Sequence, residues 1–366
     1  MEKLTIGIVF GGKSSEHEVS LQSTKNVVEA MDRTKYNIVL IGVDKSGRWH
    51  LCDESDFLNH ADDPARIQLN KTNQRIAVVP GEESAQIIEL QNHKPVGEID
   101  CIFPVIHGTL GEDGSLQGLL RTLNLPFVGV DLLGSAVSMD KDIAKRLLRD
   151  AGLSVANGFV FKKHQHSLIK YETIVKELST PLFVKPVNQG SSVGVNKVNS
   201  EAEFYQAIDE AFQYDDKLLI EETVNGREIE CAILGNEDPK ASLPGEILPQ
   251  TDFYSYESKY INESGAKLQA PARLSEEETK RVQQVALNVF NVLDCEGMAR
   301  VDFFMKENGD LIINEVNTIP GFTKISMYPK LWEITGLTYP ELIDRLIVLA
   351  FERFNRKQQL KSAVFE

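Results

Sequence analysis

Short apolar runs and alternating apolar and polar positions predict strands along most of this chain. Residues 4–10 form an apolar run that indicates a buried strand. The capping-box spacing of Ser15 and Glu18 predicts that a helix begins just after it. Another helix is expected after residue 113, and further strands are expected at residues 36–44, 99–106 and 126–128. Strands that alternate with helices are typical of a parallel sheet covered by helices.

Two further units follow along the chain. A helix predicted over residues 134–151 leads into a second unit, which we expect to be a small, mainly antiparallel α+β subdomain. Its strands are expected at residues 181–186, 193–198 and 217–222, with a helix at 202–212. The third unit should contain strands at 228–234, 299–305 and 310–316 and helices at 275–293 and 339–354. We therefore predict three domains, at residues 1–138, 139–225 and 226–366.

Composition narrows the class of protein. The 366 residues are 42% apolar and 25% charged, as in soluble enzymes. No run of about 18 apolar residues could cross a bilayer, and the first residues lack a secretory signal, so we expect a cytoplasmic protein with no membrane attachment. The four cysteines stand far apart, which favours reduced, buried thiols. The net charge of −15 argues against nucleic acid as a partner.

The segment 299–317 carries the strongest chemical signal. An Asn-Gly pair at 308–309 between two apolar runs predicts a two-residue hairpin turn. That turn would place two cross-strand pairs on one face, Asp302 with Glu315 and Arg300 with Asn317. Opposed carboxylates destabilise a sheet unless positive charge lies between them, and a divalent cation with oxygen ligands would supply it. The hairpin thus predicts a magnesium site that serves a nucleoside triphosphate, although an exposed face with ordinary charges is the alternative.

A glycine- and serine-rich loop at residues 187–194 is the second signal. Its backbone N–H groups could cover phosphate oxygens, and Lys141 and Lys185 could add positive charge. A third signal is the end of the apolar strand at 217–222, where backbone groups could read an adenine edge and Glu228 could accept from ribose hydroxyls. Together with the hairpin, these segments predict a nucleotide site.

Residues 7–14 formally match the Walker A spacing, but we interpret the match as a false positive. Ile8, Val9 and Phe10 continue an apolar strand, whereas a true phosphate loop would take them out of the core. The short turn still precedes a helix amino terminus, which favours a carboxylate or phosphate, and Glu16 there could hold an ammonium group. An amino acid has both groups, so the first unit is a candidate substrate platform.

These residues closely resemble the D-alanine–D-alanine ligases of the ATP-grasp superfamily over nearly the whole chain. The motifs that carry the resemblance are residues 11–20, His107-Gly108 with 111–114, 139–141, 189–194, 300–302, and 315–318 with Pro320-Gly321. The resemblance implies an ATP-grasp fold, of mixed α/β and α+β class, behind an N-terminal parallel-sheet α/β domain. It also implies ATP as substrate, two Mg²⁺ or possibly Mn²⁺ ions, D-alanine as the amino acid and a homodimer.

Family roles carry over onto matching positions. For the nucleotide, the resemblance implies Lys141, Lys185 and Lys259 at the phosphates and Glu221, Val224, Glu228 and Phe304 in the rest of its site. For the metal, it implies Asp302, Glu315 and Asn317. For the first D-alanine, the resemblance implies Glu16 at the ammonium group, with Ser191 and Tyr260 bonded to Glu16 to close the site. It implies Arg300 and the Gly321 N–H as stabilisers of the oxyanion. It further implies Ser326 and Met327 at the carboxylate of the second D-alanine, and His107 as a substrate-binding residue. Residues 250–260 resemble the family's mobile lid.

The reaction that this resemblance implies is the ligation of two D-alanine molecules through an acyl phosphate, for peptidoglycan precursors. A ligase with D-lactate or D-serine as second substrate is the nearest alternative. A P-loop kinase or NTPase would follow from the Walker-like match, and a non-catalytic nucleotide sensor is the remaining possibility.

Overall fold

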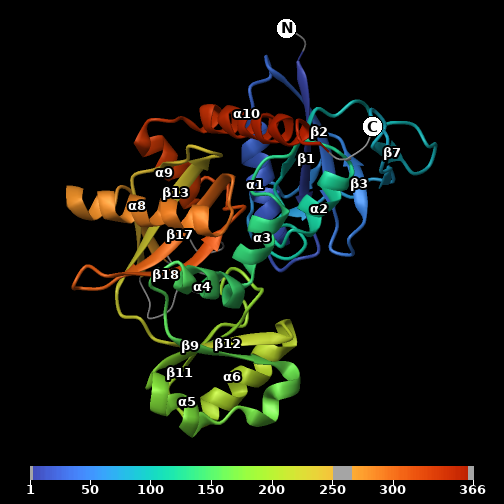
Figure 1. The fold of residues 1–366 in the computed structure, drawn as a ribbon. Helices are drawn as coiled ribbons and strands as arrows, with labels where there is room; N and C mark the ends of the chain where they lie inside the picture. The colour runs from blue at the N-terminus through green and yellow to red at the C-terminus, as the bar shows by residue number, and fades with distance from the viewer. Residues whose placement is uncertain (1–2, 250–265, 362–366) are drawn as a thin grey trace.

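The computed structural model describes residues 3–249 and 266–361, and its elements form three lobes (Figure 1). The first lobe contains a sheet in the order β3-β2-β1-β8, in which β1 (Leu4–Gly11) runs parallel to β2 (Tyr36–Val43) and β8 (Cys101–Pro104). The edge strand β3 (Trp49–Cys52) is antiparallel to β2. The expected parallel sheet is thus confirmed, with one antiparallel edge. Residues 126–128 contribute only a parallel bridge between Phe127 and Ile102.

The remaining elements of the first lobe cover or extend this sheet. Its helices are α1 (His17–Ala30), α2 (Ser115–Thr122) and α3 (Leu132–Met139). Two small antiparallel pairs lie between residues 58 and 89: β4 (Leu58–Asn59) with β5 (Gln68–Leu69), and β6 (Ile76–Val78) with β7 (Ile87–Glu89).

The predicted capping box at the first helix is wrong. Glu16, not Ser15, is the residue before α1, and its side chain makes no capping hydrogen bond. The Glu18 carboxylate instead lies 2.5 Å from the Lys45 ammonium. The Glu16 carboxylate accepts a hydrogen bond from the Ser191 hydroxyl. The helix therefore begins at His17, one residue later than a cap at Ser15 would place it.

The helix predicted over residues 134–151 is two helices, α3 and α4 (Lys141–Asp150). Asp140 separates them with extended backbone, and its side chain caps α4 by accepting from the Ile143 N–H at 3.0 Å. The same carboxylate lies 2.5 Å from the Lys217 ammonium. Because Asp is a strong cap former, the chain changes direction here and carries Lys141 and Lys145 to the second lobe.

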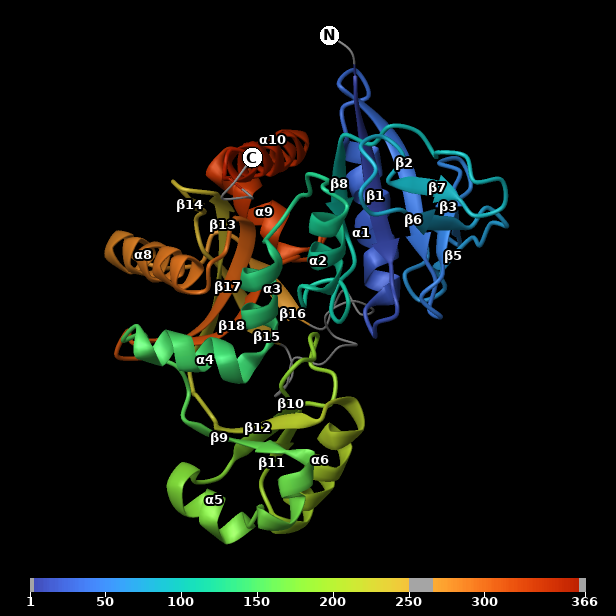
Figure 2. The ribbon, with the colours of Figure 1, turned by 45° about the vertical axis from the view of Figure 1, so that its right-hand side comes forward.

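The second lobe is the expected small antiparallel subdomain. Its sheet has the order β11-β10-β12-β9, built from β9 (Gly158–Lys162), β10 (Leu182–Pro186), β11 (Asn196–Val198) and β12 (Lys217–Glu222), and every pair is antiparallel. One face is covered by α5 (Tyr171–Leu178) and α6 (Glu201–Tyr214), with the 3₁₀ turn η1 (Lys163–Leu168) beside them (Figure 2). These elements share a core of their own around Phe204 and Ile208.

The third lobe is built on a second antiparallel sheet. Its main path is β16-β15-β13-β17-β18, formed by β13 (Arg227–Gly235), β15 (Gly245–Pro249), β16 (Ala266–Gln269), β17 (Gly297–Met305) and β18 (Leu311–Asn317), with β14 (Lys240–Ala241) beside β13. Its helices are α8 (Glu276–Val292), α9 (Met327–Thr335) and α10 (Tyr339–Gln358). No helix within residues 3–249 or 266–361 has the length and apolarity that crossing a bilayer requires.

The hairpin β17–β18 keeps the predicted cross-strand pairs but not the predicted turn. Arg300 pairs with Asn317 and Asp302 with Glu315, as expected. The turn, however, has three residues, because the Lys306 N–H donates to the Asp310 carbonyl at 2.9 Å and Gly309 takes a left-handed φ of 82°. A bulge between Asp302 and Phe303 restores the register by one residue.

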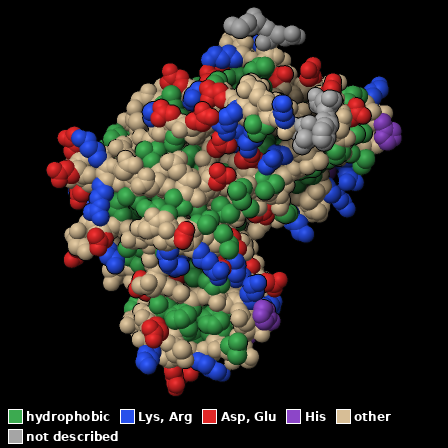
Figure 3. Space-filling view, in the orientation of Figure 1, with side chains coloured by type: hydrophobic (Ala, Val, Ile, Leu, Met, Phe, Trp, Pro, Cys, Tyr) green, Lys and Arg blue, Asp and Glu red, His purple; other side chains and the backbone are tan. Residues whose placement is uncertain are grey.

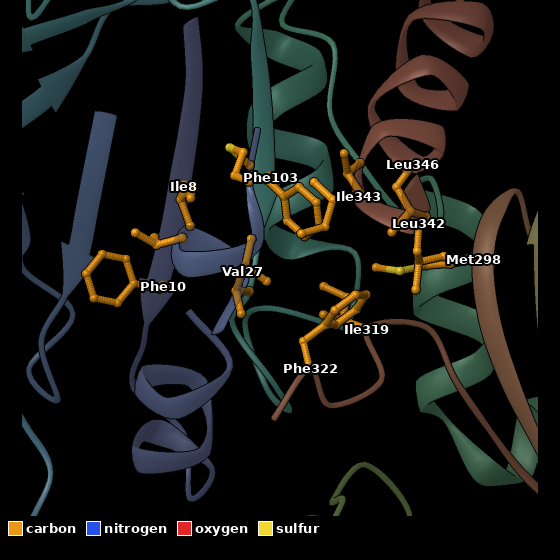
Figure 4. Close-up of a cluster of buried hydrophobic side chains, with 14 of the residues drawn as sticks. Ile8, Phe10, Val27, Phe103, Met298, Ile319, Phe322, Leu342, Ile343 and Leu346 are labelled. Atoms are coloured by element: carbon orange, nitrogen blue, oxygen red, sulfur yellow. The ribbon is translucent and has the colours of Figure 1, made fainter. Parts of the chain in front are cut away.

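The first and third lobes share one hydrophobic core (Figure 4). Ile8 and Phe103 of the first sheet lie in the same buried cluster as Phe322, Leu342 and Leu346 of the last part of the chain. A buried arginine of α10, Arg353, stacks over the Phe127 ring at 4.4 Å and donates to the carbonyls of Phe127 and Gly129. The last helix is thus held to the first lobe by both apolar and polar contacts.

Surface charge is mixed rather than segregated on the face that Figure 3 draws, where acidic and basic side chains are interspersed. All four cysteines are buried and carry free thiols, as expected. Burial raises the pKa of the Cys52 thiol to about 11, so that thiol is protonated and unreactive near neutral pH.

Candidate active site

A cavity of about 360 Å³ is lined by residues of the second and third lobes. One wall comes from β10, the glycine-rich loop after it and β12, and the other comes from β13, β17, β18 and residues 321–327. Polar and charged side chains from both walls face this space, so it can hold a ligand with both charged and apolar parts.

The carboxylates of the hairpin form one wall of this cavity. Arg300 binds Asp302 with two hydrogen bonds of 2.7 Å each, and the Asn317 amide donates to Asp302 at 3.0 Å. The Lys141 ammonium lies 3.4 Å from Glu315. Arg300 and Lys141 thus already supply part of the positive charge that the opposed carboxylates require.

The same residues nevertheless suit a magnesium or manganese ion. Two carboxylates and an amide oxygen, on adjoining strands and facing a cavity, are hard oxygen ligands of the kind that these ions take. In the described part of the chain no three His, Cys, Asp or Glu side chains gather as a metal cluster. An ion held by two carboxylates keeps positions for substrate phosphates.

The loop after β10 has the backbone of a phosphate cover. Ser191, Ser192 and Gly194 have left-handed φ values of 51°, 61° and 67°, which turn successive N–H groups within a short stretch. The loop is held from α4, because the Lys141 ammonium donates to the Gln189 carbonyl at 2.7 Å. Lys141 therefore lies between the loop and the carboxylate hairpin.

Below the loop, two lysines flank one buried glutamate. The Glu221 carboxylate contacts the Lys185 ammonium through one oxygen, and its other oxygen lies 2.5 Å from the Lys145 ammonium. Although burial opposes it, the charges of Lys145 and Lys185 hold the pKa of Glu221 below its ordinary value. Glu221 is thus an ionised group that can only accept hydrogen bonds.

At the first lobe, Glu16 contacts the same loop. The Ser191 hydroxyl donates to the Glu16 carboxylate, although the two residues come from different lobes. Gly108 and Gly190 leave room for this carboxylate, since a Cβ atom at either position would lie within 2.6 or 2.8 Å of Glu16 Oε2. The amino terminus of α1 thereby meets the loop over the cavity.

His107 lies buried behind this contact. Its Nδ1 donates to the Ile319 carbonyl at 2.9 Å, and its Nε2 lies 2.9 Å from the Ser23 hydroxyl. Burial opposes the charged form, but the neighbouring Glu112 carboxylate outweighs it and raises the pKa of His107. His107 therefore joins the first lobe to the segment after β18.

Ser326 and Met327 begin α9 at the far end of the cavity. The Ser326 hydroxyl accepts from the Thr323 N–H at 3.0 Å, and a Cβ atom on Gly321 would lie 2.7 Å from that hydroxyl oxygen. The first N–H groups of a helix favour an anion. This end of the cavity therefore suits a carboxylate.

Comparison with known proteins identifies this arrangement. The family profile "D-ala D-ala ligase N-terminus" matches residues 5–130, and "D-ala D-ala ligase C-terminus" matches residues 147–348. A D-alanine–D-alanine ligase from Shouchella clausii is 59% identical over 366 residues, which is 100% of both chains. The chain belongs to the D-alanine–D-alanine ligase family.

Solved structures agree with this assignment. The D-alanine–D-alanine ligase of Coxiella burnetii superposes with a TM-score of 0.85 at 42% identity, over 98% of this chain and 97% of that one. The VanG D-Ala:D-Ser ligase of Enterococcus faecalis superposes with a TM-score of 0.83 at 37% identity, over 95% of this chain and 100% of that one. The fold is the expected ATP-grasp fold behind a parallel-sheet domain.

Most residues that the family resemblance had implied come together. Those that line the cavity are Lys141, Lys185, Ser191, Glu221, Val224, Glu228, Arg300, Asp302, Phe304, Glu315, Asn317, Gly321, Ser326 and Met327. Glu16 reaches it through Ser191, and His107 lies behind that contact. Lys259, Tyr260 and the expected lid at 250–260 fall outside the described residues. The Walker-like match is a false positive, because residues 7–10 lie within β1.

The charged residues of the cavity that the sequence did not indicate include Lys145 and Glu230. Lys145 stands four residues after Lys141 on α4, which places both on one helix face. Glu230 stands two residues after Glu228 on β13, opposite Asp302, and lies 3.1 Å from Arg300. The helical period from Lys141 and the strand period from Glu228 are the signals that could have indicated Lys145 and Glu230 as residues of the same site.

We expect Gly190→Ala to weaken D-alanine use without unfolding the protein. The new methyl group would push the Glu16 carboxylate, which is the end of a flexible side chain, away from Ser191. The expected result is a rise of about tenfold in the KM for D-alanine, the effect of about 1.4 kcal/mol of lost binding. Steady-state kinetics would measure it, with thermal melting as the check on folding. An unchanged KM would show that Glu16 tolerates displacement.

Proposed function

We propose that this protein uses ATP to join two D-alanine molecules into D-alanyl-D-alanine, a precursor of peptidoglycan. The observation that supports the proposal best is that the carboxylate hairpin and the lysine-bearing phosphate loop face each other across one cavity. Identity of 59% to a D-alanine–D-alanine ligase over the whole chain supports the choice of substrate. We place the reaction in the cytoplasm, where ATP is supplied.

ATP would bind with its base beside Glu221, Val224 and Phe304 and its phosphates under the loop of residues 189–194. The ionised Glu221 would accept from an amino group of the base. Lys141 and Lys185 would neutralise phosphate charge, and Glu228 would accept from the ribose. Asp302, Glu315 and Asn317 would hold one or two Mg²⁺ ions, which supply charge neutralisation at the β- and γ-phosphates when bound.

The first D-alanine would bind at the amino terminus of α1, with its ammonium group on Glu16. Its carboxylate oxygen attacks the γ-phosphorus, the bond from that phosphorus to the bridging oxygen of ADP breaks, and an acyl phosphate forms. Ser191, already bonded to Glu16, would hold the loop closed over this intermediate. Exclusion of water protects the acyl phosphate from hydrolysis.

The second D-alanine would place its carboxylate at Ser326 and the start of α9. Its amine, after losing a proton, attacks the carbonyl carbon of the acyl phosphate. Arg300 and the Gly321 N–H would stabilise the oxyanion that develops, and inorganic phosphate then leaves as the peptide forms. Arg300 is held for this task by Asp302 and Glu230.

The decisive experiment follows ADP and dipeptide together. The purified protein with Mg-ATP and D-alanine should release one ADP for each D-alanyl-D-alanine, and L-alanine should give neither product. D-serine and D-lactate, offered in competition with D-alanine, would test the second-substrate alternatives. ADP release that does not depend on D-alanine would contradict the ligase assignment.

A further inference from the structure

Three charged side chains meet beneath the phosphate loop, and only two of them belong to the set that the family resemblance named. Lys145 from α4, Lys185 from β10 and Glu221 from β12 all line the cavity. Their side chains are 3%, 12% and 4% exposed, so Lys145 is as buried as the glutamate that it faces. A buried ammonium group requires a specific reason, because removing it from water is costly.

This cluster has one more positive charge than negative charges. Glu221 provides one negative charge, whereas Lys145 and Lys185 provide two positive charges, one at each carboxylate oxygen. The Lys145 contact of 2.5 Å is a charge pair, and its ammonium has no aligned hydrogen bond to a described residue. The surplus positive charge faces the cavity, where a polyphosphate would balance it.

Lys185 and Lys145 differ in how exposed they are and in how freely they can turn towards a bound phosphate. Lys185 is the more exposed and stands at the end of β10, directly before the phosphate loop. Lys145 lies four residues after Lys141 in α4, and its burial leaves it Glu221 as its one carboxylate partner among the described residues. Lys185 can therefore turn towards a phosphate, provided that Glu221 keeps another counter-charge.

We propose that Lys145 is a positioning residue that acts as the permanent counter-charge of Glu221 and so releases Lys185 to the nucleotide phosphates. Without Lys145, Lys185 would be the one cationic partner of Glu221 among the described residues, and Glu221 would keep it from the ligand. The inference rests on the proposed nucleotide site and assigns Lys145 a task that none of the motifs indicated.

The test compares a nucleotide that has phosphates with one that has none. Isothermal titration of the full-length protein would give Kd values for Mg-ADP and for adenosine. We expect Lys145→Met to weaken Mg-ADP binding by about 10- to 100-fold, as loss of one charge-assisted contact predicts, and adenosine binding by less than about threefold. Lys145→Arg keeps the charge and should restore most of the Mg-ADP affinity.

The double variant Lys145→Met/Glu221→Gln separates positioning from direct contact. Removing the carboxylate as well leaves nothing to retain Lys185, so the ratio of the adenosine Kd to the Mg-ADP Kd should recover towards that of the wild type. If the ratio stays as low as in Lys145→Met, Lys145 touches the phosphates itself and the positioning role is overturned. An unchanged ratio in Lys145→Met would also overturn it.

A matched control removes another partly buried lysine nearby. Lys217 pairs with Asp140 and Asp142 outside the cavity, so Lys217→Met should lower the melting temperature but leave the ratio of the two Kd values unchanged. A fall of the ratio in this control to the Lys145→Met value would overturn the inference, since the loss would then follow from general loosening. Failure of the wild-type protein to bind Mg-ADP would instead contradict the proposed function itself.

Discussion

Glu315→Gln should reduce kcat/KM for D-alanyl-D-alanine formation by at least about a thousandfold, because it removes one of the two carboxylates proposed to hold the magnesium ion. A metal ion at a transferring phosphate supplies several kcal/mol of charge stabilisation, and about 4 kcal/mol corresponds to a factor of a thousand. Glu315 faces Asp302 across the hairpin and lines the cavity. Its amide analogue keeps the shape but halves the negative charge of the pair.

Two measurements check this expectation. Coupled assay of ADP gives the rate, and titration of Mn²⁺ followed by electron paramagnetic resonance gives metal affinity, which should fall in the same variant. Glu307→Gln is the matched control, because Glu307 is an exposed glutamate in the turn of the same hairpin. Wild-type Mn²⁺ affinity in Glu315→Gln would contradict the proposed metal site, whatever the rate.

Glu16→Gln should raise the KM for D-alanine by roughly 100-fold or more, with ATP binding little changed. Loss of the charged partner of a buried ammonium group costs about 3–5 kcal/mol, which is a factor of about 10² to 10³ or more in affinity. Glu16 is 6% exposed, so water cannot replace the lost charge readily. The Ser191 hydroxyl can still donate to the amide oxygen, and the loop should therefore stay in place.

Glu18→Gln on the same helix is the control for the loss of a carboxylate. Glu18 pairs with Lys45 and does not line the cavity, so its variant should keep a wild-type KM. Nucleotide affinity, measured by titration with Mg-ADP, separates the amino-acid site from the phosphate site. Equal losses for D-alanine and Mg-ADP in Glu16→Gln would contradict a role at the ammonium group.

The fold class and most of the residues that line the cavity could be predicted because periodicity and motif spacing are local properties of the sequence. The parallel first sheet, the antiparallel second lobe and the pairing of Asp302 with Glu315 are all confirmed. The expected pairing of Asp302 with Glu315 holds although the turn has three residues instead of two, because the bulge near Asp302 shifts the register back by one residue. Register deduced from a turn alone cannot include a bulge.

What the sequence could not give depends on contacts between distant segments. The Asp140 side chain that caps α4 also pairs with Lys217, which is 77 residues away, and Glu16 and Glu18 at the start of α1 contact Ser191 and Lys45. The buried pair of Lys145 and Glu221 joins α4 to β12, and nothing local to either residue indicates it. The domain boundaries, the roles of single site residues and the homodimer remain predictions.

The core that joins the first and last segments has a consequence for biosynthesis. The face of the first sheet that carries Phe103 is completed by Leu342, Ile343 and Leu346 of α10, and Arg353 satisfies backbone carbonyls at residues 127 and 129. On the ribosome, residues 4–104 are synthesised long before residues 339–358, which form α10. The first sheet therefore cannot bury Phe103 against α10 until that helix has also been synthesised, and its apolar face stays uncovered in the meantime.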